Sequence, residues 1–357
     1  MPRPDLIPLR DKRLLVTGAG GYIGGVLFRH LVDSGLDVIG TVLDEREEQA
    51  LRQAGYKAAE LNLADSRPWD SLLEGIDVVF HIAAMFQEYE GTRAQYQQVN
   101  CDAALKLAKT AARQGVSRFV HCSTVGVHGA VKEIPCTEDT PYNPMDVYHQ
   151  TKLAGELAVL EFGRSLPKDG MVVTVNRPAM VYGPGDTRMM LKLCKMIDAG
   201  WFRMIGSGEV LAHLGFIDDQ IDSFVLCATA PRDDVHCEAF NIASDQPCTL
   251  NELARSIAKS LGTGLSRMRV PVWPVWLAAL ACEIACKPLG LRPPLFRRRV
   301  GFFTHNRAFD LTKARQRLGY RSRWQLADGV AETVRWYRSL PVGTSEELLA
   351  NPVKVVE

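Results

Sequence analysis

The first half of the chain alternates short apolar runs with segments in which apolar residues recur every three or four positions. Runs of about six apolar residues are typical of strands covered on both faces of a parallel sheet, and the longer period is typical of helices packed against it. The expected strands are 13–17, 37–43, 76–83, 116–123 and 171–176, and the expected helices are 22–34, 100–114 and 148–162. Because crossovers between parallel strands are right-handed, this order predicts an α/β fold of the Rossmann type, with a doubly wound parallel sheet.

The pattern loosens after Pro184, where helices are expected at 189–199, 250–261 and 312–318 and short strands at 216–217 and 239–242. We therefore predict a Rossmann domain over residues 1–185 and a smaller, mostly helical substrate lobe over 186–342. Segments near 210–245 are expected to return to the first domain, and 343–357 is expected to be a loosely held tail.

The most apolar stretch, 270–286, contains two prolines and one glutamate and is short for a membrane span. We expect it to form a buried helix beneath or beside a substrate site. The alternative is that 270–299 associates weakly with a membrane surface, because Arg297, Arg298 and Arg299 follow the apolar stretch.

Composition excludes some classes of function. The 357 residues include 42 basic and 41 acidic ones, and a net charge of +1 gives no electrostatic reason to expect a nucleic-acid partner. The nine cysteines show no spacing typical of a zinc site, so no metal is expected, and reduced thiols fit a cytoplasmic protein. The first ten residues contain three prolines and no apolar run, unlike a signal peptide.

A glycine-rich turn, 17–24, follows the first expected strand and opens the first expected helix. Gly18 permits a tight turn, Gly21 lets the backbone approach a pyrophosphate, and Gly24 lets the helix pack closely on the strand. The amides at the start of the helix, at Tyr22 and Ile23, then face the phosphates. This context, rather than the glycines alone, predicts a dinucleotide site.

An acidic residue about 20 positions further along binds the adenosine ribose in such sites, and Asp44 lies there. A carboxylate repels a 2′-phosphate, so NAD is favoured over NADP as the cofactor. Arg46 is close enough to bind such a phosphate, and Asp44 could instead be a solvated loop residue. The sequence therefore does not decide between NAD and NADP.

Tyr148 and Lys152 are four residues apart at the start of an expected helix, which places them on one face. A nearby ammonium lowers the pKa of a tyrosine and so prepares the phenol to exchange a proton with an alcohol or ketone. Ser123 and Thr124 end an expected strand, and the carboxyl ends of parallel strands line the ligand crevice of such a fold. A hydroxyl there can hold the substrate oxygen against Tyr148.

Together these pieces resemble the extended short-chain dehydrogenase/reductase family over nearly the whole chain. The matching segments are T-G-A-G-G-Y-I-G (17–24), D-V-V-F-H-I-A-A (77–84), V-N (99–100), S-T-V-G-V-H-G (123–129), Y-H-Q-T-K (148–152) and N-R-P-A-M-V-Y-G-P-G-D (176–186). The resemblance implies a catalytic triad of Thr124, Tyr148 and Lys152, with Ser123 as the lesser candidate for the hydroxyl. It also implies a homodimer.

The resemblance implies further contacts with the cofactor. Lys152 would hold the nicotinamide ribose, and the cleft would be lined by Ala83, Ala84 and Pro178. Asn62 and Leu63 stand where the family contacts adenine, although the family's usual Asp is Asn62 here. His81 matches a frequent strand residue of the family, and we interpret it as structural.

Departures from the patterns of family subgroups narrow the reaction that the resemblance implies. The 4,6-dehydratases carry two carboxylates after the catalytic threonine, where this chain has Val125 and Gly126, so an elimination is not expected. Sugar-nucleotide enzymes commonly place an arginine on the diphosphate, where this chain has Ala212. His213 is similar to a histidine of the branch of 3β-hydroxysteroid and sterol-4-carboxylate dehydrogenases, and we interpret it as structural.

We therefore predict an NAD(P)-dependent oxidoreductase that interconverts a secondary alcohol and a ketone on a hydrophobic, sterol-like small molecule. Trp273 and Trp276 could wall an apolar pocket. Arg188 or Arg292 could pair with a substrate phosphate or carboxylate, although the simpler interpretation of each is a surface residue. The alternatives are a nucleotide-sugar 4-epimerase and a cofactor-binding regulatory protein without turnover.

Overall fold

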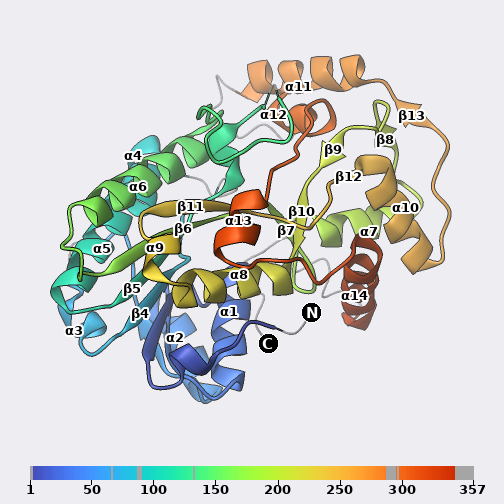
Figure 1. Ribbon diagram of the computed structural model, residues 1–357. Helices are drawn as coiled ribbons and strands as arrows, with labels where there is room; N and C mark the ends of the chain where they lie inside the picture. The colour runs from blue at the N-terminus through green and yellow to red at the C-terminus, as the bar shows by residue number, and fades with distance from the viewer. Residues whose placement is uncertain are drawn as a thin grey trace.

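A seven-stranded parallel sheet forms the centre of the molecule (Figure 1). The computed structural model describes residues 3–65, 67–86, 91–131, 133–286, 295 and 297–341. The strands of the sheet are β1 (Arg13–Thr17), β2 (Asp37–Val42), β3 (Ala58–Glu60), β4 (Val78–His81), β5 (Arg118–Cys122), β6 (Val172–Pro178) and β11 (Glu238–Ile242). Their order, β11-β6-β5-β4-β1-β2-β3, reverses direction between β1 and β4. This order confirms the predicted doubly wound fold and places a ligand crevice at the carboxyl ends of β1 and β4.

Helices cover both faces of this sheet. One face carries α1 (Tyr22–Asp33), α2 (Glu45–Gln53) and α8 (Ile217–Thr229), and the other carries α3 (Asp70–Leu73), α5 (Ala103–Arg113) and α6 (Val147–Arg164). Because successive strand residues point to opposite faces, Leu14 and Val16 enter the first core and Leu15 enters the second. Short segments complete this half: η1 (Ile7–Leu9), α4 (Arg93–Gln97), the π-helical turn η2 (Gln98–Asp102), η3 (Val125–His128) and α9 (Arg232–Val235).

A second group of elements lies beside the carboxyl ends of the sheet (Figure 1). It contains three two-stranded sheets: β7 (Met180–Tyr182) with β10 (Leu214–Phe216), β8 (Met204–Ile205) with β13 (Arg269–Val270), and β9 (Leu211–Ala212) with β12 (Cys248–Thr249). Its helices are α7 (Met190–Asp198), α10 (Leu250–Leu261), α11 (Val272–Cys286), α12 (Arg297–Val300), η5 (Gly301–Phe303), α13 (Thr312–Arg317) and α14 (Leu326–Ser339). Helices α7, α10 and α14 pack on one another.

Two expectations in this half need revision. The strand expected at 216–217 ends at Phe216, and Ile217 is the first residue of α8. Helix α8 was not predicted, because it is buried around most of its circumference and lacks a polar face that would show its period. Helix α14 was also not predicted. The domain boundaries at 185 and 342 stay predictions, and the expected tail, 343–357, lies outside the described residues.

The expectation that 270–286 forms a buried helix is wrong. Among the residues of α11, only Ala279 is buried, whereas Trp273, Trp276, Leu277 and Ile284 are 68%, 40%, 49% and 63% exposed. The helix lies along the outer edge of the molecule, with α12 against it (Figure 1). The apolar residues of α11 point to all sides of the helix, so packing one side against the molecule leaves the others in solvent. Trp273 and Trp276 are on the exposed side and do not line an internal pocket.

Within the described residues, none of the helices is both long enough and apolar enough to cross a bilayer.

Candidate active site

The glycine-rich turn joins β1 to α1 at the switch point of the sheet. Gly18 has a φ of +73°, and a Cβ there would lie 2.9 Å from the Cα of Ala83, so the turn and the end of β4 are in direct contact. A Cβ at Gly24 would overlap the carbonyl oxygen of Gly18. These two positions therefore require glycine for steric reasons.

The start of α1 fits a dinucleotide phosphate. Gly21 is the N-cap of the helix, and no side chain caps it, so the amides of the first turn, including those of Tyr22 and Ile23, remain for an anion. The Tyr22 hydroxyl is buried and, among the described residues, has no hydrogen-bond partner. An open helix terminus and an unsatisfied hydroxyl beside it are features that a bound cofactor would complete.

The carboxylates near the ribose position differ from the expectation. Asp44 caps α2, and its Oδ1 accepts the N–H of Glu47 at 2.9 Å. The Glu47 carboxylate turns back, accepts the N–H of Leu43 at 3.2 Å, and lies 3.1 Å from where a Cβ of Gly20 would stand. Glu47, which the sequence analysis did not select, is thus the carboxylate beside the glycine turn.

The other expected cofactor contacts lie along the same edge of the sheet. The N–H of Ala83 donates to the Thr17 hydroxyl at 3.1 Å, and Ala84 is half-buried next to it. Pro178 ends β6. The Asn62 carboxamide oxygen accepts the N–H of Ala64 in a turn after β3, and Leu63 is buried in the second core.

Helix α6 presents the expected catalytic pair. Asp146 caps the helix through the N–H of His149, which fixes where Tyr148 begins the first turn. The Lys152 ammonium is buried and donates to the carbonyl oxygen of Cys122 at 2.5 Å. Since Cys122 is the last residue of β5, this bond ties the start of α6 to the carboxyl end of the central strand.

The two candidate hydroxyls follow Cys122 directly. The Thr124 hydroxyl accepts the N–H of Gly126 at 3.0 Å, which leaves its own hydrogen available to a substrate. The Ser123 hydroxyl is buried and, within the described part of the chain, has no hydrogen-bond partner. A Cβ at Gly126 would overlap the imidazole of His149, so the loop after Thr124 lies directly against the residue next to Tyr148. The structure thus brings all four predicted residues to one place.

The protonation of Tyr148 differs from the expectation. Burial raises the pKa of the phenol, the Cys122 thiol adds to this increase, and the Arg188 guanidinium opposes it. The expected lowering of the tyrosine pKa is therefore wrong for this structure. Burial also lowers the pKa of Lys152. The reason is that loss of water around a buried phenol outweighs the neighbouring cations.

Phe86 and Arg188 lie beside Tyr148, and the sequence analysis did not predict that these residues meet. The Phe86 ring meets the Tyr148 ring edge to face, with centroids 5.0 Å apart. The Arg188 guanidinium carbon lies 4.2 Å from the centroid of the Phe86 ring, on its face. Arg188 precedes α7 and Phe86 follows β4, so no local spacing connects them.

Both histidines interpreted as structural are bound within the core. The His81 Nδ1 lies 2.9 Å from the Thr17 hydroxyl, and burial lowers the pKa of this imidazole to about 3. The His213 ring binds backbone through both nitrogens, at 2.7 Å to the Ser244 carbonyl and 3.0 Å to the Phe309 N–H. His213 therefore has no ring nitrogen left to contact a substrate.

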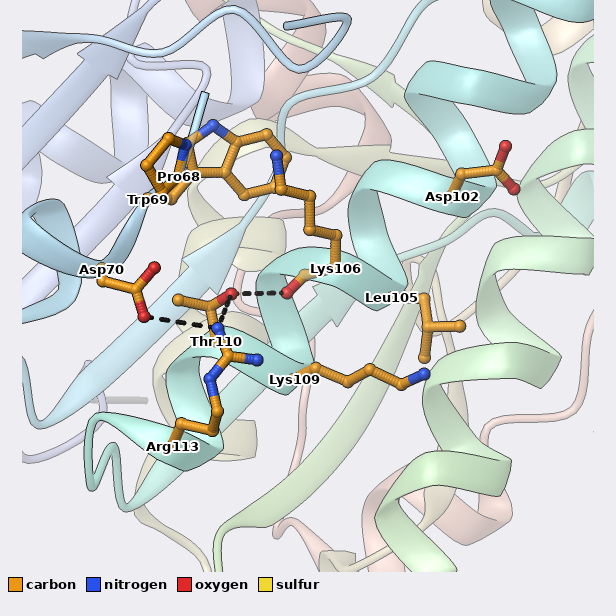
Figure 2. A pocket seen from close by; sticks show the side chains of 9 residues that line it. All are labelled: Pro68, Trp69, Asp70, Asp102, Leu105, Lys106, Lys109, Thr110 and Arg113. Carbon is orange, nitrogen blue, oxygen red and sulfur yellow. Dashed lines mark hydrogen bonds and ion pairs between the residues drawn. The ribbon is translucent and has the colours of Figure 1, made fainter. Parts of the chain in front are cut away.

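A hollow of about 500 Å³ lies away from these residues, between α3 and α5. Figure 2 shows its lining side chains, which are Pro68, Trp69, Asp70, Asp102, Leu105, Lys106, Lys109, Thr110 and Arg113. Several of these side chains contact one another. The Lys106 ammonium lies 3.9 Å from the centroid of the Trp69 ring, and Arg113 donates a hydrogen bond to Asp70 at 3.3 Å. None of them is a predicted site residue, so this hollow is not the candidate active site.

Comparison with known proteins identifies the family of the chain. The model of the NAD dependent epimerase/dehydratase family matches residues 14–243. A 3-beta-hydroxysteroid dehydrogenase of Mycolicibacterium neoaurum is 26% identical over 341 residues, which cover 92% of this chain and 92% of the relative. A sterol-4-alpha-carboxylate 3-dehydrogenase, decarboxylating, of Mus musculus is 25% identical over 342 residues, 93% of this chain and 92% of the relative.

The fold is also that of solved structures. The crystal structure of UDP-glucuronic acid 4-epimerase from Bacillus cereus in complex with NAD superposes with a TM-score of 0.72, at 20% identity, over 91% of this chain and 98% of the other. At this identity the likeness concerns the fold alone.

Proposed function

Because the chain belongs to the NAD dependent epimerase/dehydratase family, we propose that it is an NAD(P)-dependent oxidoreductase that interconverts a secondary alcohol and a ketone on a hydrophobic, sterol-like small molecule. The observation that carries the proposal is the bond from Lys152 to the Cys122 carbonyl. This bond ties the helix that carries Tyr148 to the end of the strand that Ser123 and Thr124 follow. The two dehydrogenases named above, whose names specify steroid and sterol substrates, support the substrate class.

The residues of this chain supply proton transfer and orientation. A bound nicotinamide would give or take the hydride. In reduction the Tyr148 hydroxyl donates its proton to the ketone oxygen, and burial holds the phenol in this protonated form. In oxidation the deprotonated Tyr148 takes up the proton of the alcohol. The Thr124 hydroxyl donates a hydrogen bond to the same oxygen, with Ser123 as the second donor beside it. Lys152 would hold the ribose of the nicotinamide.

The nucleotide-sugar alternative has less support. Ala212 is buried in β9 and can form no ion pair with a diphosphate. The next residue, His213, has both ring nitrogens bound to backbone. A net change in added cofactor distinguishes the two reactions, because an epimerase returns its hydride to the substrate.

The preference for NAD rests on charge beside the glycine turn. The Glu47 carboxylate lies beside the glycine turn, near where the adenosine ribose of a dinucleotide would lie, and it would repel a 2′-phosphate. Asp44, which caps α2, adds a second negative charge three residues away in the chain. Arg46 remains the one cation within this stretch that could favour NADP.

Substitution of Tyr148→Phe tests the proposal. It removes the proton donor but keeps the ring that packs on Phe86, so we expect turnover to fall by about 10²–10⁴-fold while cofactor binding stays intact. The measurement is the absorbance change of the reduced nicotinamide with sterol alcohols and ketones, together with calorimetric titration of NAD. Tyr337→Phe, on α14, is the matched control. Full activity of the Tyr148 variant would refute the mechanism.

A further inference from the structure

Arg188 is separated from the proposed proton donor, Tyr148, by a single aromatic ring. Its guanidinium is stacked on Phe86, and Phe86 in turn contacts Tyr148. The residue is half-buried, whereas an ordinary surface arginine extends into water. A guanidinium held over a ring by its carbon can still offer N–H groups to a carboxylate or a phosphate.

The acidic side chain two residues before Arg188 makes its hydrogen bonds to the backbone and none to the guanidinium, although the two charges attract each other. Asp186 directs its carboxylate to the first turn of α7, where it accepts the N–H groups of Arg188, Met189 and Met190 at 3.0–3.1 Å. Among the described residues, no carboxylate forms an ion pair with the Arg188 guanidinium. A half-buried guanidinium in this state is poised for an anion that comes with the substrate.

We propose that Arg188 binds an oxyanion group that the substrate carries a few bonds from the reacting carbon. This inference rests on the proposed function, because Tyr148 locates the reacting oxygen. It narrows the substrate to a hydrophobic secondary alcohol, or the matching ketone, with a nearby carboxylate or phosphate ester. One aromatic ring separates the two groups, so the anion and the hydroxyl belong to the same end of the molecule.

Three matched substrates and two variants test this assignment. The substrates are one hydrophobic alcohol bearing a neighbouring carboxylate, its methyl ester, and its phosphate-monoester counterpart. For Arg188→Met we expect kcat/KM to fall by about 10–100-fold with the anionic substrates and by less than about threefold with the ester. Arg188→Lys should restore more activity with the phosphate than with the carboxylate, since an ammonium lacks the bidentate fork.

A binding measurement keeps the test independent of turnover. Calorimetric titration of the carboxylate into the NAD-loaded protein should show binding that Arg188→Met weakens to the same degree. Equal losses on all three substrates, or no preference of the wild type for an anion, overturns the inference. The proposed function survives that result as long as the ester is still turned over through Tyr148.

A second inference comes from α11, independently of the site. Trp273, Leu277 and Ile284 are four and seven residues apart and share one exposed face with Trp276. Glu283, the one acidic residue of the helix, forms an ion pair with Arg297 at 2.9 Å, so its negative charge is compensated. We call these four side chains the α11 apolar face.

The sequence on both sides of α11 is rich in positive charge. Residues 264–300 include seven basic residues and one acidic residue, whereas the rest of the chain has 35 basic and 40 acidic ones. The Arg297 guanidinium carbon lies 5.6 Å from the centroid of the Trp276 ring. Exposed tryptophans with adjacent cations are the combination that anionic lipid headgroups bind.

We infer that the α11 apolar face docks on an anionic bilayer, with the helix lying in the plane of the headgroups. The charge of the surrounding segment favours a lipid surface over a second copy of this chain, because two copies would bring like charges together.

Sedimentation with vesicles tests this inference. The variant carries Trp273→Ser, Leu277→Ser and Ile284→Ser. The control is Ile7→Ser, because Ile7 is an apolar residue of η1 that is 60% exposed. We expect the wild type and the control to bind phosphatidylcholine vesicles that contain phosphatidylglycerol, and the triple variant to bind at least about tenfold more weakly. High salt should weaken binding, and pure phosphatidylcholine should bind less.

Three results would overturn it. They are equal binding by the triple variant, no binding of the wild type to either vesicle, and a wild-type dimer in sedimentation velocity that the triple variant loses. The last result would assign the face to a second copy of the chain.

Discussion

At the scale of the residue, the carboxylate that lies beside the glycine turn is not the one that the spacing in the sequence predicts. Asp44 has the expected distance from the glycine turn, yet its carboxylate caps α2. Glu47, one turn later, is carried back over the glycine turn by the same cap and by its bond to the Leu43 N–H. The capping bond therefore uses Asp44 at the start of α2 and leaves Glu47, three residues later, as the carboxylate beside the glycine turn.

Glu47→Gln should relax the choice of cofactor. Removing one negative charge a few ångströms from a 2′-phosphate is worth about 1 kcal/mol in a solvated site, so the ratio of kcat/KM for NADP to that for NAD should rise about fivefold. Steady-state kinetics with both cofactors measure this ratio. Glu45→Gln, on the same helix but bonded to Gln49, is the control. An unchanged ratio, or the same rise in the control, would reject the role given to Glu47.

At the scale of the element, a buried ion pair positions α6. The Glu156 carboxylate and the Arg177 guanidinium are almost fully buried, and Arg177 Nε donates to both carboxylate oxygens at 3.1 Å. Arg177 also contacts His128 of η3 at 3.1 Å and donates to the Tyr142 hydroxyl at 2.9 Å. Since Glu156 follows Lys152 by one helical turn, the pair links the catalytic helix to β6 and to the loop after Thr124.

Glu156→Gln should be strongly destabilising, because it leaves the Arg177 charge buried with a weaker partner. We expect the free energy of unfolding to fall by about 3–5 kcal/mol. Denaturant titration measures the loss. Lys57→Gln, which breaks the exposed pair with Asp37, should cost less than about 1 kcal/mol. If both variants lost the same stability, the buried pair would not be what holds α6 in place.

At the scale of the whole molecule, the chain leaves the sheet and returns to it. After β6 it enters β7, which pairs with β10 in the second lobe, and it comes back only at β11, which pairs with β6. Arg188 lies on that excursion and Phe86 lies before it, so the anion-binding group assembles only when both lobes are in place. The near-zero net charge of the chain likewise conceals a positive segment of sequence, 264–300, which contains the exposed helix α11.

The sequence alone determined those features that depend on neighbours along the chain. The apolar periods located β1, α1 and α10 to within a residue, and the order of strands and helices defined the doubly wound sheet. The glycine turn and the spacing of Tyr148 and Lys152 are equally local, because backbone conformation and helix pitch are properties of consecutive residues.

Only the tertiary structure decided which groups meet and which stay in solvent. The Cys122 carbonyl as the partner of Lys152, the contact of Arg188 with Phe86, and the exposure of α11 each depend on residues far apart in the chain. Burial then reversed the expected direction of the Tyr148 pKa. The loss of water around a side chain and its tertiary contacts depend on residues that are distant in the sequence. A local pattern of residues therefore does not determine them.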